Sequence, residues 1–426
     1  MDQHTVLVFA YYFPPMGLSG VQRVSKFVKY LPEQGWRPIV VTTGPTAYYA
    51  HDASMLEDFE GRPIEIHRTS GKDPNSLLKD AGTIKMPREF VRKFLNRLSS
   101  TFFVPDNKRS WAKQALITAR EIVATTHVDT IFVSGPPFSA MMAASALAQE
   151  TGIPLVVDYR DLWYGNQFSF YPTPWHAHLH KKFEYDVLTH ASKVIVTNRR
   201  IKERLINTYP HLPFDDVVII SQGFDPDDFR RPIPTTARTQ AFKLTYAGIF
   251  YEFVTPKYMF KAVAQFLQER PNAAIELHFA GLLRDEHAKT AKSLGLEAIV
   301  HDHGYCSHAD TIDLLRSSDA LWMMVGNGKN ADTVSSGKLY EYFGTGKPVL
   351  ASLPQGSLRQ AAERYGAAQI TNPTDVAAIA SSIATMYDQW RSNTQPKADV
   401  AFVRTFDRRV LTSELAKQLA HSMNLH

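Results

Sequence analysis

Residues 5–43, TVLVFAYYFPPMGLSGVQRVSKFVKYLPEQGWRPIVVTT, contain a strand, a helix and a second strand in succession. The apolar run at 5–10 is typical of a buried strand. Residues 21–33 repeat apolar side chains every three or four positions, which gives one helical face. Residues 37–43 return to a β-rich apolar run. This order predicts a βαβ unit and therefore a parallel sheet.

The same alternation continues along the first half of the chain. Helical patterns separate four further strand-like runs, at 129–134, 154–158, 193–197 and 217–221. Residues 225–239, DPDDFRRPIPTTART, then hold three prolines, several charges and no apolar period. This composition predicts a linker between two domains.

The alternation restarts after this linker. We predict strands at 243–247, 274–280, 298–301, 320–325 and 348–351, and helices at 256–268, 286–294, 309–316, 338–343 and 408–421. The prediction is an α/β fold of two parallel-sheet domains, residues 1–224 and 225–405, followed by a final helix within 406–426. Such a pair of domains places a ligand in the cleft between them, at the carboxyl ends of the strands.

Composition narrows the class of protein. The chain has 426 residues, of which 44% are hydrophobic and 21% charged, which excludes a disordered protein. A formal charge of +5 suits anionic ligands or an anionic membrane surface and does not indicate nucleic-acid binding. Cys306 is the single cysteine, so no intramolecular disulfide is expected. With neither a signal-peptide pattern nor a membrane-spanning run, we expect a cytoplasmic protein.

Two glycines follow the first strand and precede its helix. Gly17 and Gly20 would let the backbone approach a ligand closely, and the free N–H groups of a helix start favour an anion. The alternative is an ordinary βα turn whose glycines relieve steric crowding. The residues alone leave both interpretations open.

Charged residues gather after another predicted strand, in VDYRDLW at 157–163. Asp158, Arg160 and Asp161 would stand at a strand's carboxyl end, where a carboxylate beside an arginine can position a hydroxyl or accept its proton. The alternative is an Arg–Asp pair that braces the loop. The run SGPPFS at 134–139 follows the preceding strand and could lie beside it.

A Ser-Ser-Gly turn opens a helix in VSSGKLYEYFGTGKPV at 334–349. The free amides at Ser335, Ser336 and Gly337 suit a phosphate. Lys338 stands in the first turn, where the helix dipole disfavours a cation, and this conflict indicates an anion nearby.

Glu341 follows Lys338 by about one helical turn and could accept two ribose hydroxyls. The alternative for this pair is a surface ion pair between residues i and i+3, worth a few tenths of a kcal/mol. The tight turn of GTGKP that follows returns the chain to a strand and favours the ligand-binding interpretation.

The run YAGIFYEFVTPK at 246–257 carries the last candidates for an anion site. Gly248 permits close approach of a ligand, and Lys257 could bind a phosphate as a point charge. A solvated lysine is the alternative. His301 and His303 flank an aspartate, but the sequence places no further ligand beside them, so we expect no metal.

Residues 84–104, IKMPREFVRKFLNRLSSTFFV, combine five basic residues and one acid with an apolar stripe. This pattern is compatible with an interfacial helix on anionic lipid. A helix whose stripe packs on its own domain is the alternative. We favour packing for Leu95 and Leu98, and we retain peripheral membrane contact for the basic face.

Taken in order, these motifs resemble retaining glycosyltransferases of family 4, which have the GT-B fold. The resemblance extends over nearly the whole chain and rests on YYFPP, SGPPFS, DYRDLW, SQGFD at 221–225, and SGKLYEYFGTGKPV. It implies two Rossmann-like domains with an interdomain cleft, and a nucleotide-sugar donor held mainly by the second domain. It also implies that the final helix, within 406–426, crosses back to the first domain.

The resemblance also implies roles for individual residues. It places Glu341 on the donor ribose, Lys338 and the preceding amides near the donor, and Gly17 and Gly20 at the diphosphate. Lys257 matches one member of the family's usual basic pair, whereas the customary arginine has no clear match.

Two further positions depart from the family. The family's first glutamate is replaced by Thr333, which leaves open which group contacts the sugar ring. The family often has a histidine near the reacting centre, and Asp161 is our substitute for it on the acceptor side, together with Asp158 and Arg160.

The function implied by the resemblance is a glycosyltransferase of the hexosyltransferase class. It would act without a metal or cofactor and with retention, and it would use a nucleotide-diphosphate sugar, with UDP favoured as the commonest. The acceptor would be a glycan or a lipid-linked precursor in polysaccharide biosynthesis. Lys257, Lys338 and the helix-start amides would stabilise the departing diphosphate. The alternatives are a nucleotide-sugar-binding subunit without transferase activity and a GT-B nucleotide-sugar 2-epimerase.

Overall fold

The structure is a computed structural model that describes residues 3–17, 19–44, 46, 48, 50–71, 89–167, 169–232, 240–250 and 253–424. The chain forms two compact units. The N-terminal unit comprises Met1–Gln222 and Arg408–His426, and the C-terminal unit comprises Gly223–Asp407.

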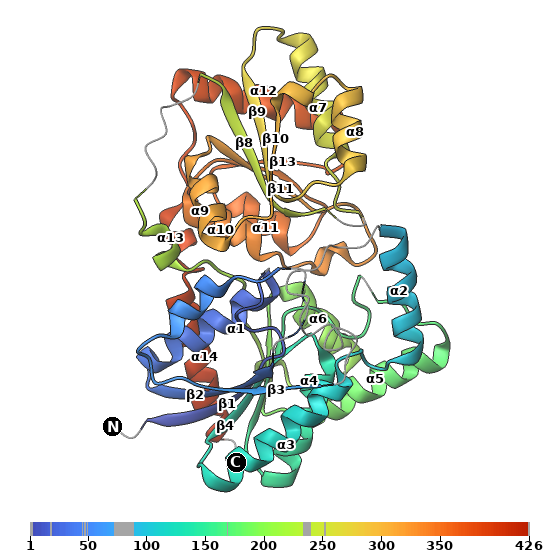
Figure 1. The fold of residues 1–426 in the computed structure, drawn as a ribbon, viewed down its shortest axis with the longest axis vertical. Helices are drawn as coiled ribbons and strands as arrows, with labels where there is room; N and C mark the ends of the chain where they lie inside the picture. Colours follow the sequence, from blue (N-terminus) through green and yellow to red (C-terminus); the bar gives the residue numbers. More distant parts are fainter. Residues whose placement is uncertain are drawn as a thin grey trace. The chain divides into compact units, whose positions relative to one another are not determined.

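The N-terminal unit is built on a seven-stranded parallel sheet with the order β3-β2-β1-β4-β5-β6-β7 (Figure 1). Its central strands are almost continuously apolar because helices cover both faces of the sheet. The strands are β1 (His4–Phe9), β2 (Trp36–Thr43), β3 (Glu65–Thr69), β4 (Thr130–Gly135), β5 (Leu155–Tyr159), β6 (Lys193–Val196) and β7 (Val217–Ile219).

Two hydrophobic clusters cover the two faces of this sheet. In β1, Leu7 and Phe9 join one cluster, and Val6 and Val8 join the other, as the two-residue period of a strand requires. The α-helices of the unit are α1 (Ser19–Tyr30), α2 (Glu89–Phe102), α3 (Arg109–Thr125), α4 (Phe138–Thr151), α5 (Pro174–Thr189), α6 (Arg199–Thr208) and α14 (Arg408–Met423).

The last helix, α14, packs in the N-terminal unit, where it lies beside α1 and contacts β4 and β5 (Figure 1). Leu411, Leu415 and Leu419 recur at a helical spacing and join the cluster that contains Val8. The Arg408 guanidinium lies 5.9 Å from the centre of the Phe27 ring on α1. Helix α14 therefore completes the N-terminal unit, although it follows the C-terminal unit in the sequence.

The C-terminal unit has a six-stranded parallel sheet with the order β10-β9-β8-β11-β12-β13. Its strands are β8 (Phe242–Ile249), β9 (Ile275–Leu282), β10 (Val300–Gly304), β11 (Ala320–Met324), β12 (Val349–Ser352) and β13 (Ala368–Thr371). Its α-helices are α7 (Lys257–Glu269), α8 (Asp285–Ser293), α9 (His308–Ser317), α10 (Gly337–Thr345), α11 (Ser357–Arg364), α12 (Val376–Ser392) and α13 (Val400–Arg404).

The predicted fold class of two parallel-sheet, Rossmann-like units is confirmed. The structure adds two strands that the sequence did not indicate, β3 with the sequence EIHRT and β13 with the sequence AQIT. Both lie at an edge of their sheet, and both are too polar or too short for an apolar run to reveal them. Residues 233–239 of the predicted linker lie outside the described residues.

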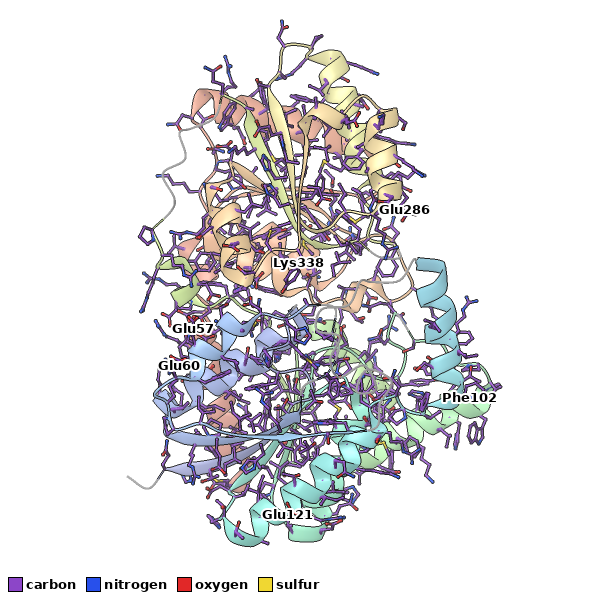
Figure 2. All side chains as sticks on the ribbon, viewed as in Figure 1. Glu57, Glu60, Phe102, Glu121, Glu286 and Lys338 are labelled. Atoms are coloured by element: carbon purple, nitrogen blue, oxygen red, sulfur yellow. The ribbon has the colours of Figure 1, made fainter. Side chains whose placement is uncertain are left out.

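The expectation that Leu95 and Leu98 pack on their own domain is wrong. Their exposed fractions are 49% and 46%, and Phe102 at the end of α2 is 72% exposed and points outward in Figure 2. Helix α2 contacts its unit through other groups. The Thr101 carbonyl is hydrogen-bonded to His176 of α5, and the Arg97 guanidinium lies over the Phe170 ring. Residues 84–88 of the predicted amphipathic segment lie outside the described residues, among which no helix is long and apolar enough to cross a membrane.

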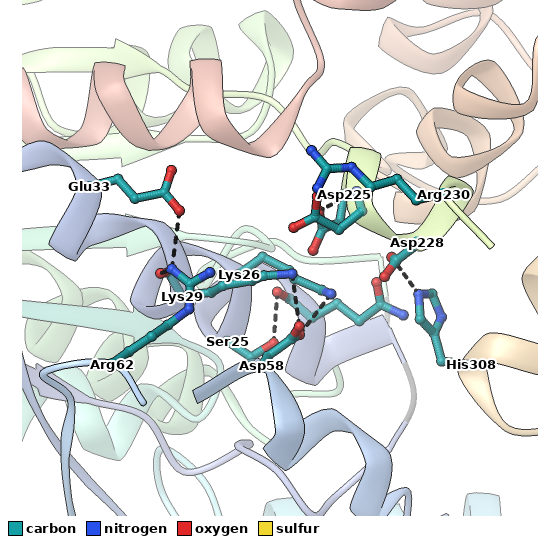
Figure 3. Close-up of polar contacts among 12 residues, drawn as sticks. Ser25, Lys26, Lys29, Glu33, Asp58, Arg62, Asp225, Asp228, Arg230 and His308 are labelled. Atoms are coloured by element: carbon teal, nitrogen blue, oxygen red, sulfur yellow. Dashed lines mark hydrogen bonds and ion pairs between the residues drawn. The ribbon is translucent and has the colours of Figure 1, made fainter. Parts of the chain in front are cut away.

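Ion pairs anchor short turns to the helices of each unit (Figure 3). In the N-terminal unit, Lys26 and Lys29 of α1 each approach Asp58 within 2.8 Å. Asp58 belongs to the short helix η2 (Ala53–Phe59), which is thereby tied to α1. In the C-terminal unit, Asp228 accepts a hydrogen bond from His308 at 2.8 Å at the start of α9.

Candidate donor-binding site

The carboxyl ends of β8 and β9 leave space for the Lys338 side chain, because both strands have a glycine there. Gly248 and Gly281 are register partners with φ angles of +134° and +137°, which L side chains rarely adopt. A Cβ on Gly281 would overlap the Gly248 carbonyl, and a Cβ on Gly248 would overlap the Lys338 ammonium. These glycines therefore create the space into which Lys338 extends.

Lys338, labelled in Figure 2, extends from the first turn of α10 to Tyr246 near the end of β8. Its Nζ donates to the Tyr246 hydroxyl at 3.1 Å and lies 4.8 Å from the centre of the Tyr246 ring. Tyr246 is buried, and this burial raises the pKa of its hydroxyl, which stays neutral. Both contacts orient the ammonium at the end of β8.

The start of α10 offers hydrogen-bond donors next to this lysine. Ser336 is the N-cap, but its side chain makes no capping bond, so the first N–H groups of the helix are not satisfied by that hydroxyl. The Ser335 Oγ is buried and has no hydrogen-bond partner among the described residues. No described atom lies within 4 Å of the place of a Cβ on Gly337, so the turn borders open space.

The resemblance predicts that Glu341 and Thr333 stand at the positions of the family's two glutamates. Glu341 is half-buried, and among the described residues it has no hydrogen-bond or ion-pair partner. Thr333 is 3% exposed, and its hydroxyl donates to the Asn330 carbonyl at 2.8 Å. The Thr333 side chain is therefore tied to the backbone, whereas the Glu341 carboxylate is available to a ligand.

Lys257, the first residue of α7, lines a pocket of about 260 Å³ between α7 and α8. The pocket is also lined by Thr255, Pro256, Phe260, Glu286, His287 and Thr290. Glu286, labelled in Figure 2, is largely exposed and places a carboxylate at this pocket. The predicted role of Lys257 on the diphosphate stays a prediction.

The predicted glycine loop of the N-terminal unit makes internal contacts. The Gly17 N–H donates to the Ala50 carbonyl at 2.9 Å. A Cβ on Gly20 would meet the Arg160 guanidinium at 3.6 Å, which is ordinary contact. The Gly17 amide is thus already used, and the expected contact of both glycines with a diphosphate stays a prediction.

Asp158 and Arg160 brace the N-terminal unit through separate partners. Asp158 is fully buried and accepts from the Arg23 guanidinium at 2.7 and 2.9 Å and from the Ser134 hydroxyl at 2.6 Å. Arg160 donates to the carbonyls of Gly20 and Pro136. The structure thus brings SGPPFS beside DYRDLW, and the known contacts of both residues are structural.

Asp161 differs from these two residues. It is only half-buried, and among the described residues its carboxylate makes no hydrogen bond. Burial raises its pKa, and the neighbouring Arg160 charge partly opposes that rise. A carboxylate with a raised pKa and free oxygens is suited to accept a hydroxyl proton.

The model of one protein family, Glycosyltransferase Family 4, matches residues 20–228, which is nearly the whole first segment of the N-terminal unit. The N-terminal unit is therefore similar to Glycosyltransferase Family 4 over most of its length. Together with its two-sheet GT-B fold, this match makes the chain a glycosyltransferase. No curated protein matches the chain in sequence.

Solved structures support the fold of this glycosyltransferase along its whole length. HepE from Anabaena in complex with UDP has 16% identity and a TM-score of 0.64, covering 98% of this chain and 100% of that chain. Sucrose-phosphate synthase from Thermosynechococcus elongatus has 13% identity and a TM-score of 0.58, covering 99% and 97%. A putative UDP-N-acetylglucosamine 2-epimerase from Listeria monocytogenes has 13% identity and a TM-score of 0.57, covering 97% and 95%.

The structure of the glycosyltransferase also reveals residues that the sequence analysis missed. Tyr246 holds the Lys338 ammonium, and Gly281 packs against Gly248. A signal for them exists, because β8 and β9 both end in an aromatic residue followed by Ala-Gly and an aliphatic residue. The repeated Ala-Gly would have marked two neighbouring strand ends as sites of close approach.

Glu184 is a second omission, in the N-terminal unit of the glycosyltransferase. Its carboxylate is fully buried on α5 and accepts from the Tyr164 N–H at 3.0 Å and the Tyr209 hydroxyl at 2.7 Å. Burial raises the pKa of Glu184 to about 7. The Tyr164 contact ties the loop that follows Asp161 to α5.

Proposed function

We propose that this glycosyltransferase moves a hexosyl group from a UDP-sugar to a glycan or lipid-linked acceptor, with retention and without a metal in the transfer step. The observation that carries the proposal is the Lys338 ammonium, held against Tyr246 beside the start of α10. A fixed cation next to the positive end of a helix is suited to a diphosphate.

The proposed chemistry is electrostatic. Negative charge grows on the leaving diphosphate as the bond to the sugar breaks, and Lys338 with the amides at the start of α10 stabilises it. Glu341 holds the donor ribose through its free carboxylate. On the acceptor side, Asp161 orients the attacking hydroxyl. Retention follows if that hydroxyl attacks the face from which the diphosphate departs and a phosphate oxygen takes its proton.

The choice of UDP draws on the structural relatives. HepE was solved with UDP and with UDP-glucose, and the two complexes cover 98% of this chain. The epimerase relative is likewise named for a UDP-sugar. A 2-epimerase would need no acceptor, and a binding subunit would neither transfer nor hydrolyse the donor, so both alternatives are separable by experiment.

The test begins with thermal melting of the full chain in UDP, GDP, dTDP and their sugar conjugates, with and without EDTA. We expect UDP to raise the melting temperature whether or not EDTA is present, because a ligand of the folded state stabilises it by mass action. Release of UDP from UDP-glucose in the presence of a membrane-lipid extract then measures transfer. Interconversion of the sugar at C2 without an acceptor would instead identify the protein as a 2-epimerase. Binding of the UDP-sugar without any turnover would identify it as a binding subunit.

We further propose that the protein works at the cytoplasmic face of an anionic membrane, through an apolar patch on α2 and the start of α5. The contacts of Thr101 with His176 and of Arg97 with Phe170 join the two segments. The patch comprises Leu95, Leu98, Phe102, Phe103, Phe170 and Trp175, which are 42–72% exposed. Exposed Arg97 and Lys181 add positive charge beside it.

Vesicle sedimentation tests this surface. The wild-type protein should pellet with vesicles that contain phosphatidylglycerol and remain in solution with phosphatidylcholine alone. The double variant Phe102→Asp with Trp175→Asp should bind at least about tenfold more weakly, because each aromatic side chain gains over 1 kcal/mol on burial. Phe214→Asp is the matched control, since Phe214 is 66% exposed outside the patch. Equal loss in the control, or no binding by the wild type, would overturn the proposal.

A further inference from the structure

Four side chains of the types that ligate metals share one face of the C-terminal sheet, away from the proposed donor site. Glu276 and His278 lie on β9, and His301 and His303 lie on β10. His278 and His301 are register partners on these parallel strands. The two-residue period of a strand places Glu276 on the same face as that pair. The register shifts at His303, and this residue is placed beside His278 by direct contact.

This face is the one that α9 and α10 cover. Ala280 lies two residues after His278 on β9 and so points to the same face. It joins the hydrophobic cluster that contains residues of α9 and α10. Leu277 and Phe279 point to the opposite face and join the cluster with α7 and α12. The four side chains therefore lie on the α9 side of the sheet, at its edge strand β10, with His278 only 8% exposed.

The side chains already touch one another. The His278 Nε2 lies 3.0 Å from the Glu276 Oε2, and the His278 Nδ1 lies 2.9 Å from the His303 Nε2. The His301 ring stacks on the His278 ring with 4.7 Å between centroids. One ligand atom each from Glu276, His278 and His301 can be chosen so that all lie within 4.8 Å of one another.

We propose that Glu276, His278 and His301 form a binding site for a divalent transition metal, with Zn²⁺ the best match. Zinc binds imidazole nitrogen and carboxylate oxygen at about 2.0–2.2 Å, so tetrahedral ligand atoms lie about 3.3 Å apart. The 3.0 Å between Glu276 and His278 is close to that separation. Small rotations of these side chains, and of His301, would complete the coordination.

His303 acts as a positioning residue. When the His278 Nε2 binds the metal, the ring proton stays on its Nδ1. This N–H donates a hydrogen bond to the His303 Nε2, 2.9 Å away. Such a partner fixes the tautomer and orientation of a histidine ligand.

The site is separate from the proposed donor chemistry. Glu276 and His278 lie in the amino-terminal half of β9, whereas Gly281 marks the carboxyl end near Lys338. Three protein ligands leave a fourth position for water. A metal here would tie the edge strand β10 to β9, and transfer itself would still need no metal. Lys243, the register partner of Glu276 on β8, places a positive charge nearby and limits the affinity.

Binding of the metal itself is the test. The full-length protein is stripped with EDTA, dialysed and titrated with Zn²⁺ by calorimetry, and with Co²⁺ by visible absorption. We expect one Zn²⁺ per chain and the intense bands of tetrahedral Co²⁺. Glu276→Gln and His301→Ala should each weaken binding at least about 100-fold. His303→Ala should weaken it about 10- to 100-fold, and His303→Gln, which keeps an acceptor, should restore part of that loss.

His127→Ala is the matched control, because His127 lies beside Asp129 in the N-terminal unit and is 87% exposed. It should leave binding unchanged. Each variant should keep the far-ultraviolet circular dichroism spectrum and the UDP-induced melting shift of the wild type, which separates loss of the metal site from loss of the fold or of the donor site. An octahedral Co²⁺ spectrum in the wild type, or equal Zn²⁺ binding by Glu276→Gln and His301→Ala, would overturn the proposal.

Discussion

Replacing Lys338 by alanine should lower kcat/KM for sugar transfer by about 100- to 1,000-fold, the usual loss when a group that stabilises transition-state charge is removed. The same change should abolish the melting shift caused by UDP. The reason is that Lys338 places a cation at the carboxyl end of β8, beside the start of α10. Transfer assays and calorimetry with UDP measure the two effects.

Three further variants show whether the position of this charge matters. Lys292→Ala removes a lysine that is 71% exposed on α8 and should change nothing. Tyr246→Phe keeps the ring and removes the hydroxyl partner, so it should have an intermediate effect. Gly248→Ala keeps the charge but pushes a methyl group into the Lys338 ammonium, and it should approach the loss of Lys338→Ala. A Lys338→Ala protein that binds UDP with unchanged affinity would remove this lysine from the donor site.

Replacing Asp158 by alanine should destabilise the protein more than any change at the surface. Arg23 is fully buried and donates to both Asp158 oxygens and to the carbonyls of Ile220 and Ser221. Removing one partner leaves a buried charge uncompensated, which costs about 3–5 kcal/mol. For a unit of this size the melting temperature should fall by roughly 10 °C. Calorimetry measures the fall.

The chain supplies a matched control for this ion pair. Arg120 and Glu150 also form a bidentate ion pair. The Arg120 Nε and Nη2 donate to the two Glu150 carboxylate oxygens at 2.8 and 2.7 Å, but both side chains are exposed. Glu150→Ala should therefore leave the melting temperature almost unchanged, because exposed pairs contribute little. The double variant Arg23→Met with Asp158→Leu should lose less stability than Asp158→Ala, since it leaves no buried charge unpaired. Equal melting of Asp158→Ala and Glu150→Ala would contradict the argument.

The sequence predicted the sheets well because most of their strands are buried on both faces. Strands such as β1 and β12 are continuous apolar runs, and their ends were placed within about two residues. The strands β3 and β13 lie at sheet edges, where one side meets solvent and polar residues suffice. A search for apolar runs therefore does not find these two edge strands. Leu95 and Leu98 illustrate the opposite failure, an apolar stripe that the unit leaves exposed.

The candidate site was predictable only in parts. The glycine pattern and the charge conflict at the helix start indicated Gly248 and Lys338, but their contact joins positions 90 residues apart. The Glu276–His278 pair carries no local signal of function. Its neighbours are set by strand register, which places His278 opposite His301 across a connection that includes a whole helix. Contacts of this kind follow from topology and not from spacing.

The packing of α14 in the N-terminal unit has a consequence for biosynthesis. The C-terminal unit is continuous in the chain and can finish folding once its own residues have left the ribosome. The N-terminal unit must wait for α14, although its sheet is translated before the C-terminal unit. Until then Val8 and Phe27 lack their leucine partners on α14 and expose an apolar face to the cell. A nascent chain arrested before residue 408 should therefore engage chaperones through the half of the protein that was made first.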